Sequence, residues 1–125
     1  MAEPISIVAA ESVTQLEDVA GRVLVAGSHG GVIAAYLGAK AGVHALILND
    51  AGVGKDRAGI AGLFYLEDLG MAAAAVDCMS ARIGDGRSMW ESGRISHANA
   101  VAAQAGVARG MSVQDFARAV ATSSR

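Results

Sequence analysis

The chain of 125 residues has a formal net charge of −2 and no run of basic residues, which excludes the electrostatic surface that nucleic-acid binding requires. With one Trp, two Tyr and two Phe, it also offers few rings on which bases could stack. Its apolar stretches are too short and too often interrupted by glycine to cross a bilayer, and Glu3 precedes the first of them, unlike the basic start of a secretory signal. We therefore expect neither a nucleic-acid nor a membrane partner.

The length is close to that of the commonest single domains, so residues 1–125 are predicted to form one α/β domain. A domain of this size buries about two thirds of its surface and needs no disulfide or metal. Cys78 is the single cysteine, which fits a reducing compartment and predicts a cytoplasmic location. Because alanine and glycine fill little volume, we expect the chain to bury more surface as a homo-oligomer. Neither a cofactor nor a metal site is expected.

The first half of the chain alternates between strand-like and helix-like segments. Residues 5–10 predict a strand, and residues 13–19 predict a short helix or turn. Residues 22–26 (RVLVA) form a run with β-branched residues that ends in the glycine-rich segment 27–31, which is typical of a buried strand. Apolar residues at helical spacing then predict a helix that ends at Gly42. They are Val32, Ile33, Tyr36, Leu37 and Ala41.

The second half continues this alternation. Residues 43–48 predict a buried strand, and residues 60–69 predict an amphipathic helix closed by Gly70. The alanine-rich segment 71–79 has high helix propensity, but its position after a closed helix favours a strand. The polar segment 80–93 predicts a long loop.

Two helices are expected to finish the chain. Ser96 is the expected cap of the first, which runs to Ala105. Ser112, with Asp115 three residues later, resembles a capping box that begins the second.

Strands that alternate with helices predict right-handed crossovers and a parallel sheet. We therefore expect an α/β fold with a small three-layer open sheet of about four parallel strands and flanking helices, flavodoxin-like or Rossmann-like. The expected strand order is 2-1-3-4. In such sheets ligands bind beyond the carboxyl ends of the strands, near the point where the order reverses.

Polar residues gather after the predicted strands, at the ends that parallel strands share. The connections at the opposite ends, 20–21, 41–42 and 69–70, carry only alanine, glycine and leucine. Both sets of connections face water, so exposure alone does not explain the difference. We therefore predict a binding site at the carboxyl edge, formed by the residues that follow the strands. These are Glu11, Ser12, Ser28, His29, Gly30, Gly31, Asn49, Asp50, Lys55, Asp56, Ser80, Arg82 and Asp85.

The segment 27–31 predicts an anion-binding turn. Its glycines let backbone N–H groups approach a ligand, and the start of the following helix favours negative charge. Ser28 and His29 would be catalytic there, and Gly30 and Gly31 would bind substrate. The alternative is a tight turn in which Ser28 caps the helix and His29 faces solvent.

The same segment resembles a relaxed nucleophile elbow, because Ser28 follows a strand and precedes a helix. Asp50 or Asp77, and then His97, follow in the chain order Ser, Asp, His. Two observations stand against a hydrolase triad. Ala26 replaces the first glycine of that motif, and a single strand precedes the elbow.

Residues 49–59 are rich in glycine and polar groups. A Gly-Lys pair invites comparison with a phosphate-binding P-loop, but Asp56 stands where that motif needs Ser or Thr, so Walker-type nucleotide binding is not expected. Asn49 is predicted to bind substrate, while Asp50 and Lys55 are candidates for catalysis. Alternatively, Asp50 and Asp56 cap turns and Lys55 faces solvent.

The segment 80–87 places Ser80, Arg82 and Asp85 after the fourth strand, where we predict that all three bind substrate. The Arg82 guanidinium has the forked geometry that clamps a carboxylate or phosphate. The alternative is an ion pair between Arg82 and Asp85 that orders the loop. The loop is long enough to close over a ligand, with Trp90 as an apolar cover or as an interface anchor.

The remaining reactive side chains have less distinctive settings. His97 is expected at a helix N-terminus, where a neutral imidazole is favoured, and it would serve as a general base or as part of the cap. His44 starts a strand and is expected to be structural. Cys78 lies inside a predicted strand and is expected to be a small core residue.

Together these features predict a small-molecule enzyme, a hydrolase or lyase that acts on a compact anionic or amide substrate at the carboxyl edge of a parallel sheet. The alternatives are a non-catalytic ligand-binding or regulatory module and a subunit of a larger complex.

Overall fold

The computed structural model describes residues 7–11, 19–54 and 57–122, so the helix or turn predicted at 13–19 lies almost wholly outside the described residues. Five strands form one sheet in the order β1-β2-β3-β4-β5. Strands β1 to β4 pair in parallel, and β5 joins β4 in the antiparallel direction. The strands are β1 (Ile7–Ala10), β2 (Val23–His29), β3 (Ala45–Asn49), β4 (Ala72–Val76) and β5 (Ile95–Ala98).

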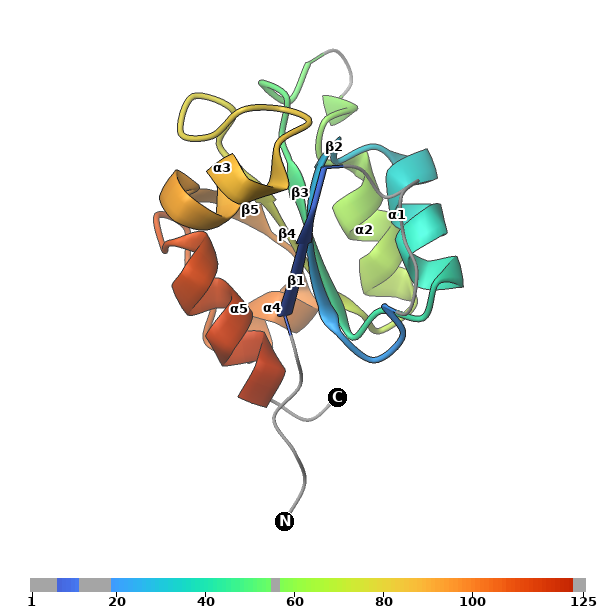
Figure 1. The fold of residues 1–125 in the computed structure, drawn as a ribbon. Coiled ribbons are helices and arrows are strands. Elements are labelled where there is room, and N and C mark those ends of the chain that lie inside the picture. The colour runs from blue at the N-terminus through green and yellow to red at the C-terminus, as the bar shows by residue number, and fades with distance from the viewer. Residues whose placement is uncertain (1–6, 12–18, 55–56, 123–125) are drawn as a thin grey trace.

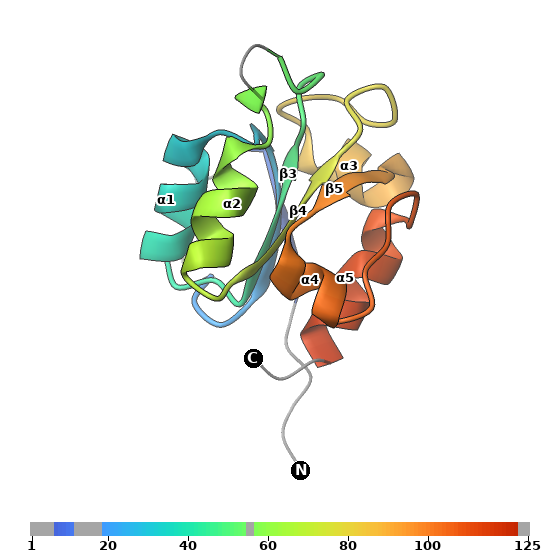
Figure 2. The same cartoon turned by 180° about the vertical axis from the view of Figure 1, so that it is seen from behind.

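Helices cover both faces of the sheet and make a three-layer molecule (Figures 1 and 2). On one face lie α1 (Val32–Lys40) and α2 (Ala61–Asp68), because successive right-handed crossovers that advance in one direction place their helices on the same side. On the other face lie α3 (Gly86–Ser92), α4 (Ala100–Gln104) and α5 (Val113–Thr122). The predicted α/β fold with a mostly parallel sheet is confirmed, with five strands rather than four.

The strands bury both of their faces, which explains their nearly continuous apolar sequences. In β2, Leu24 belongs to the core under α1 and α2, while Val23 and Val25 belong to the core under the other three helices. All five residues of the alanine-rich strand β4 are buried. Burial between two helix layers therefore overrides the helix propensity of alanine, and the strand predicted within 71–79 is confirmed.

The helix α1 turns its small residues toward the sheet. Its buried residues are Ala34, Ala35 and Gly38. By contrast, Ile33 is 78% exposed and Tyr36 is 48% exposed. A Cβ on Gly38 would lie 2.7 Å from Cδ2 of Leu46 in β3, so a larger side chain here would have to displace Leu46. The apolar spacing predicted the helix correctly but not its buried face.

The predicted strand order 2-1-3-4 was wrong. The strands lie in the sheet in their chain order, so the sheet has no point where the strand order reverses. A crevice of the switch-point type is therefore not available. The inner strands are all buried on both faces, and an apolar sequence does not specify which buried strand lies beside which.

The segment after β4 differs most from the prediction. The stretch 80–93, predicted to be a loop, contains α3, whose N-cap is Asp85. Ser96, predicted to be a helix cap, lies in the unpredicted edge strand β5. Asn99 caps α4 instead, and its side chain accepts a hydrogen bond from the N–H of Ala102.

Two predictions near the last helix are confirmed. The hydroxyl of Ser112 accepts a hydrogen bond from the N–H of Asp115 at 3.1 Å and so caps α5. His44 is buried, and its Nε2 donates to the carbonyl oxygen of Val120 at 2.8 Å, which ties the start of β3 to α5.

No helix in the described parts of the chain is long and apolar enough to cross a membrane.

Candidate functional site

The carboxyl ends of β1 to β4 share one edge of the sheet, as the sequence predicted. Their parallel pairings place the end of β2 beside the end of β3, with His29 opposite Asn49, and the end of β3 beside that of β4, with Asn49 opposite Val76. The described parts of the connections that follow β2, β3 and β4 lie together at the top of the molecule in Figure 1. The polar connections therefore share an edge, but the contacts described below divide them into two groups.

The glycines of 27–31 allow backbone segments from other parts of the chain to approach closely. The strand β2 runs on to His29, so only Gly30 and Gly31 form the turn before α1. The carbonyl oxygen of Gly27 accepts the N–H of Gly84 at 2.7 Å, and a Cβ on Gly27 would collide with the backbone at Gly84. The N–H of Gly30 donates to Asn49, and its carbonyl accepts from Gly62 at the start of α2. The N–H of Gly30 is therefore bonded within the fold and is not free to donate to an anion, while the substrate contact expected of Gly30 stays a prediction.

A cavity of about 690 Å³ lies at this edge, between the ends of β1 and β2, the start of α1 and the loop after β4; we call it the carboxyl-edge pocket. Its size falls in the range of small-molecule sites in proteins. It is lined by Glu11, Gly27, Ser28, His29, Gly31, Val32, Ile33, Ala34, Leu37, Ala58, Ala61, Ile83 and Gly84.

Four of the predicted site residues, Glu11, Ser28, His29 and Gly31, line this pocket. Ser28 is half-buried and His29 is exposed. The His29 ring lies toward the start of α1, since a Cβ on Gly31 would be 2.9 Å from its Nε2. An imidazole at this place can donate or accept a hydrogen bond to a bound molecule.

The first turn of α1 presents backbone donors to the pocket. Its N-cap is Gly31, which has no side chain to cap the helix, so the predicted alternative in which Ser28 caps α1 was wrong. Within the described residues, no acceptor bonds the N–H groups of Val32, Ile33 and Ala34. These groups have no partner inside the helix either, as at every helix start.

The rest of the lining is apolar and comes from residues that the sequence did not single out for the site. Ile33 on α1 and Ile83 in the loop after β4 both line the pocket, and they are 78% and 57% exposed. Large aliphatic side chains that are left exposed around a cavity mark binding surfaces. The signal in the sequence was the polar loop itself, in which Ile83 is the sole large apolar residue between Ser80 and Asp85.

A second group of polar residues gathers around Asp50, beyond the ends of β3 and β4; we call it the Asp50 cluster (Asp50, Asp77, Cys78, Ser96 and His97). The carboxylate of Asp50 is 5% exposed. Its Oδ1 accepts from the N–H groups of Gly52 at 2.8 Å and Cys78 at 3.1 Å, and its Oδ2 accepts from the Ser96 hydroxyl at 2.7 Å. Asp50 thus closes its own turn and fastens β5 and the start of the loop after β4 to β3.

The hydrogen bonds determine the ionisation of Asp50. Burial by itself raises the pKa of this carboxyl, but the hydroxyl of Ser96 and the N–H groups of Gly52 and Cys78 outweigh it, and the pKa lies below its ordinary value. Burial raises the pKa of the Cys78 thiol, and the charge of Asp50 raises it further. A thiol with a raised pKa is a poor nucleophile at neutral pH.

His97 lies in β5 and not at a helix N-terminus, which corrects the prediction. Its Nδ1 is 3.0 Å from the hydroxyl of Ser96, whose proton goes to Asp50, so Nδ1 is the donor of this contact. Two strands, β3 and β4, separate β5 from β2, which puts His97 and Ser28 about 14 Å apart by strand spacing. A Ser28–Asp–His97 triad cannot form.

Ligand atoms of Asp50, Asp77 and Cys78 lie within 4.8 Å of one another, a spacing that could suit a metal ion. The backbone and Ser96 contacts of Asp50, together with the bond from the N–H of Met79 to Asp77, account for this arrangement without one.

Asn49 and Ser80, predicted to bind substrate, act within the fold and do not line the pocket. Asn49 is fully buried; its amide donates to the carbonyl of Ala81 at 3.3 Å and accepts from Ala51 at 2.9 Å. The hydroxyl of Ser80 donates to the carbonyl of Asp77 and accepts from the N–H of Arg94. Both side chains brace the loops of the carboxyl edge.

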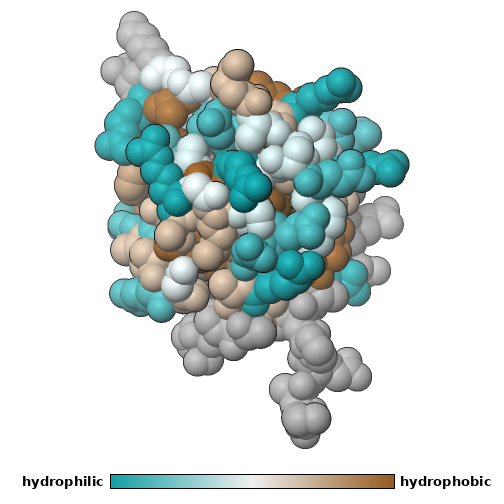
Figure 3. Space-filling view, turned by 90° about the vertical axis from the view of Figure 1, so that its left-hand side faces the viewer, coloured by the Kyte–Doolittle hydropathy of each residue, from teal (hydrophilic) through white to brown (hydrophobic). Residues whose placement is uncertain are grey.

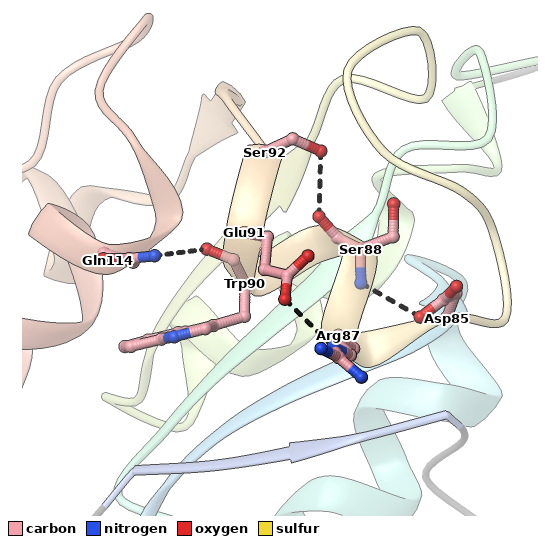
Figure 4. Close-up of polar contacts among 7 residues, drawn as sticks. All are labelled: Asp85, Arg87, Ser88, Trp90, Glu91, Ser92 and Gln114. Atoms are coloured by element: carbon pink, nitrogen blue, oxygen red, sulfur yellow. Dashed lines mark hydrogen bonds and ion pairs between the residues drawn. The ribbon is translucent and has the colours of Figure 1, made fainter.

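Arg82 and Asp85 do not line the pocket either, and they form no ion pair with each other in the described structure. The Asp85 carboxylate accepts from the N–H of Ser88 at 2.9 Å at the start of α3 (Figure 4). The Ser88 hydroxyl in turn accepts from the N–H of Arg82. Asp85 is therefore a helix cap, and the substrate contacts expected of these two residues stay predictions. Lys55 and Asp56 lie outside the described residues.

Replacing Asp85 with Ala is expected to lower the free energy of unfolding by about 1 kcal/mol, the usual loss when a helix N-cap is removed. Replacing the exposed Arg82 with Ala should change it by less than about 0.5 kcal/mol. Urea unfolding followed by circular dichroism measures both. Equal losses in the two variants would mean that the residues act as a pair.

Trp90 lies on α3, away from the carboxyl-edge pocket, and does not cover it. Its carbonyl accepts from the amide of Gln114 at 2.9 Å, which joins α3 to α5 (Figure 4). A second, smaller cavity of about 190 Å³ lies beside it, lined mainly by polar residues of α3, of the segment that follows α3 and of the start of α5. Hydrophilic side chains are spread over this side of the molecule between smaller apolar areas (Figure 3).

Comparison of the chain with protein-family models, with curated proteins and with solved structures gave no match.

Proposed function

We propose that the chain binds a compact small molecule in the carboxyl-edge pocket. One observation carries this proposal: a cavity of about 690 Å³ at the edge where the parallel strands end, next to the start of a helix. In α/β proteins this edge is the usual place for ligands, because the loops that follow the strands can vary without disturbing the sheet.

The lining indicates what kind of molecule fits. Aliphatic side chains from α1, α2 and the loop after β4 form most of the wall, so the body of the ligand is apolar. The polar groups of the lining lie at the end of β2, where Ser28 and His29 precede the first turn of α1 and its backbone N–H groups. The ligand therefore carries one polar group, of the anionic or amide kind, directed at the sheet.

A hydrolase or lyase reaction at this site is the second candidate. The observation that favours it is the placement of the His29 imidazole, which can donate or accept a hydrogen bond, beside backbone donors that can stabilise a developing oxyanion. If the protein is an enzyme, His29→Gln should abolish turnover and leave ligand binding within about threefold of wild type. If binding falls and the wild type shows no turnover, the protein is a binding module.

A thermal-shift panel of small carboxylates, phosphates and amides with apolar bodies tests the binding proposal. A ligand present at 100 times its Kd stabilises the folded state by about 2.7 kcal/mol, which raises Tm by several degrees in a domain of this size. Ala58 is exposed and lines the pocket, so Ala58→Trp should fill the mouth and remove the shift. The matched control is Ala108→Trp, at an exposed alanine outside the pocket, which should keep it.

If no compound raises Tm, or if Ala58→Trp and Ala108→Trp respond alike to every compound that does, the pocket is not the binding site.

The homo-oligomer and the cytoplasmic location expected from the sequence remain proposals. Analytical ultracentrifugation tests the first and fractionation of cells the second.

A further inference from the structure

Among the described residues, the polar groups that line the carboxyl-edge pocket comprise one anion and several hydrogen-bond donors, without a basic side chain. Glu11, which follows β1, is the single acidic residue among the described residues of the lining, and it is exposed. Neither lysine nor arginine is among the described residues that line the pocket. The N–H groups of Val32, Ile33 and Ala34 are donors only, and the positive end of the α1 dipole lies with them.

This combination disfavours both kinds of charged ligand. A carboxylate or phosphate would gain from the start of α1 but would be repelled by Glu11, and no basic side chain of the described lining would offset that repulsion. An ammonium group would gain from Glu11 but would face the positive end of α1. Like-charge contacts of this kind are how a site rejects a ligand of the wrong charge.

We propose that the pocket recognises an uncharged carboxamide on a short aliphatic or aromatic body. The inference rests on the proposed function and refines it, since the sequence left both an anionic and an amide ligand open. The amide oxygen accepts from the N–H groups of α1, and the amide nitrogen donates to Glu11. His29 and Ser28, which can both donate and accept, complete the polar end.

The apolar wall specifies the rest of the molecule. Val32, Ile33 and Leu37 of α1 face the cavity on one side and Ile83 faces it from the loop after β4. Two side chains of this wall, Ile33 and Ile83, are more than half exposed. An aliphatic chain between them removes apolar surface of both partners from water, which favours binding.

Three probes of nearly equal shape separate the possibilities: hexanamide, hexanoate and hexylamine, titrated at pH 7.5 by isothermal calorimetry against the full chain. We expect hexanamide to bind at least tenfold more tightly than either charged probe. Tighter or equal binding of hexanoate or hexylamine, removed by Ala58→Trp, overturns the carboxamide assignment and leaves the pocket proposal standing. Absence of binding by all three, together with a flat thermal-shift panel, overturns the pocket and with it the inference.

Glu11→Gln gives an independent test that does not depend on the absolute affinities. Removing the negative charge should improve hexanoate binding about fivefold and change hexanamide binding less than twofold, because glutamine can still accept a hydrogen bond. The matched control is Asp68→Asn, at an exposed acid of α2 outside the pocket, which should leave all three affinities unchanged. An unchanged ratio of hexanamide to hexanoate affinity in Glu11→Gln would contradict the assignment.

Discussion

Replacing Asn99 with Ala is expected to lower the free energy of unfolding by about 4 kcal/mol, because one side chain makes four hydrogen bonds at about 1 kcal/mol each. Its Oδ1 accepts from the N–H groups of Ala73 at 3.2 Å and Ala102 at 3.0 Å. Its Nδ2 donates to the carbonyls of Leu63 at 3.0 Å and Met71 at 2.9 Å. Asn99 is 2% exposed, so water cannot replace these partners.

Asn99→Asp separates the two halves of this network. It retains an acceptor for Ala73 and Ala102 but loses both donors, and it places a carboxylate beside the carbonyl oxygens of Leu63 and Met71. We therefore expect it to cost about 3 kcal/mol or more, the range for an unpaired buried charge. Gln104→Ala, at an exposed residue of the same helix, should cost less than about 0.5 kcal/mol. Urea unfolding measures all three, and a loss below 1 kcal/mol for Asn99→Ala would contradict the network's role.

The second large effect is expected at Asp50. Asp50→Ala leaves the N–H groups of Gly52 and Cys78 and the hydroxyl of Ser96 without their acceptor at the junction of β3, β4 and β5. We expect a loss of about 3 kcal/mol in the free energy of unfolding, since each bond to a carboxylate contributes more than a neutral one. Urea unfolding at pH 7 measures it, with Asp68→Asn on the surface as the control.

The same carboxylate makes stability depend on pH in a defined direction. Folding lowers the pKa of Asp50 below its unfolded value of about 3.9, so its contribution is fully present above that value and is lost as pH falls through the lower, folded pKa. The stability difference between wild type and Asp50→Asn should therefore be largest at neutral pH and shrink below about pH 4. A difference that stays constant from pH 7 to pH 3 would contradict the assigned ionisation.

The fold class could be predicted from the sequence because the residues that end the helices, and the apolar runs that form the strands, stand where the folded chain needs them. Gly42 and Gly70 end α1 and α2 with φ of 78° and 75°, a backbone conformation that glycine adopts without strain. The strand β4 was predicted although alanine favours helices, because the segment follows a helix in a chain where strands and helices alternate. The strand order and β5 were not recoverable, because β5 has four residues, a single β-branched side chain, and an edge position that only its pairing with β4 defines.

The site was predicted in part, and the reason lies in what each polar side chain contacts. Ser28 and His29 line the pocket as expected, because they end a parallel strand beside a helix start. Asn49 and Asp85 looked the same in the sequence but bond to backbone groups inside the fold. A sequence shows that a polar residue follows a strand, whereas its hydrogen-bond partner depends on which distant segment packs there.

The most direct test of the pocket is a titration of the ¹⁵N-labelled chain with hexanamide, followed by amide chemical shifts. We expect the largest shifts on the backbone N–H groups of Ser28, Val32, Ile33 and Gly84, around one cavity. Shifts that instead concentrate on Trp90, Arg94 and Ser112 at the second cavity would place the ligand on the opposite face of the sheet and contradict it.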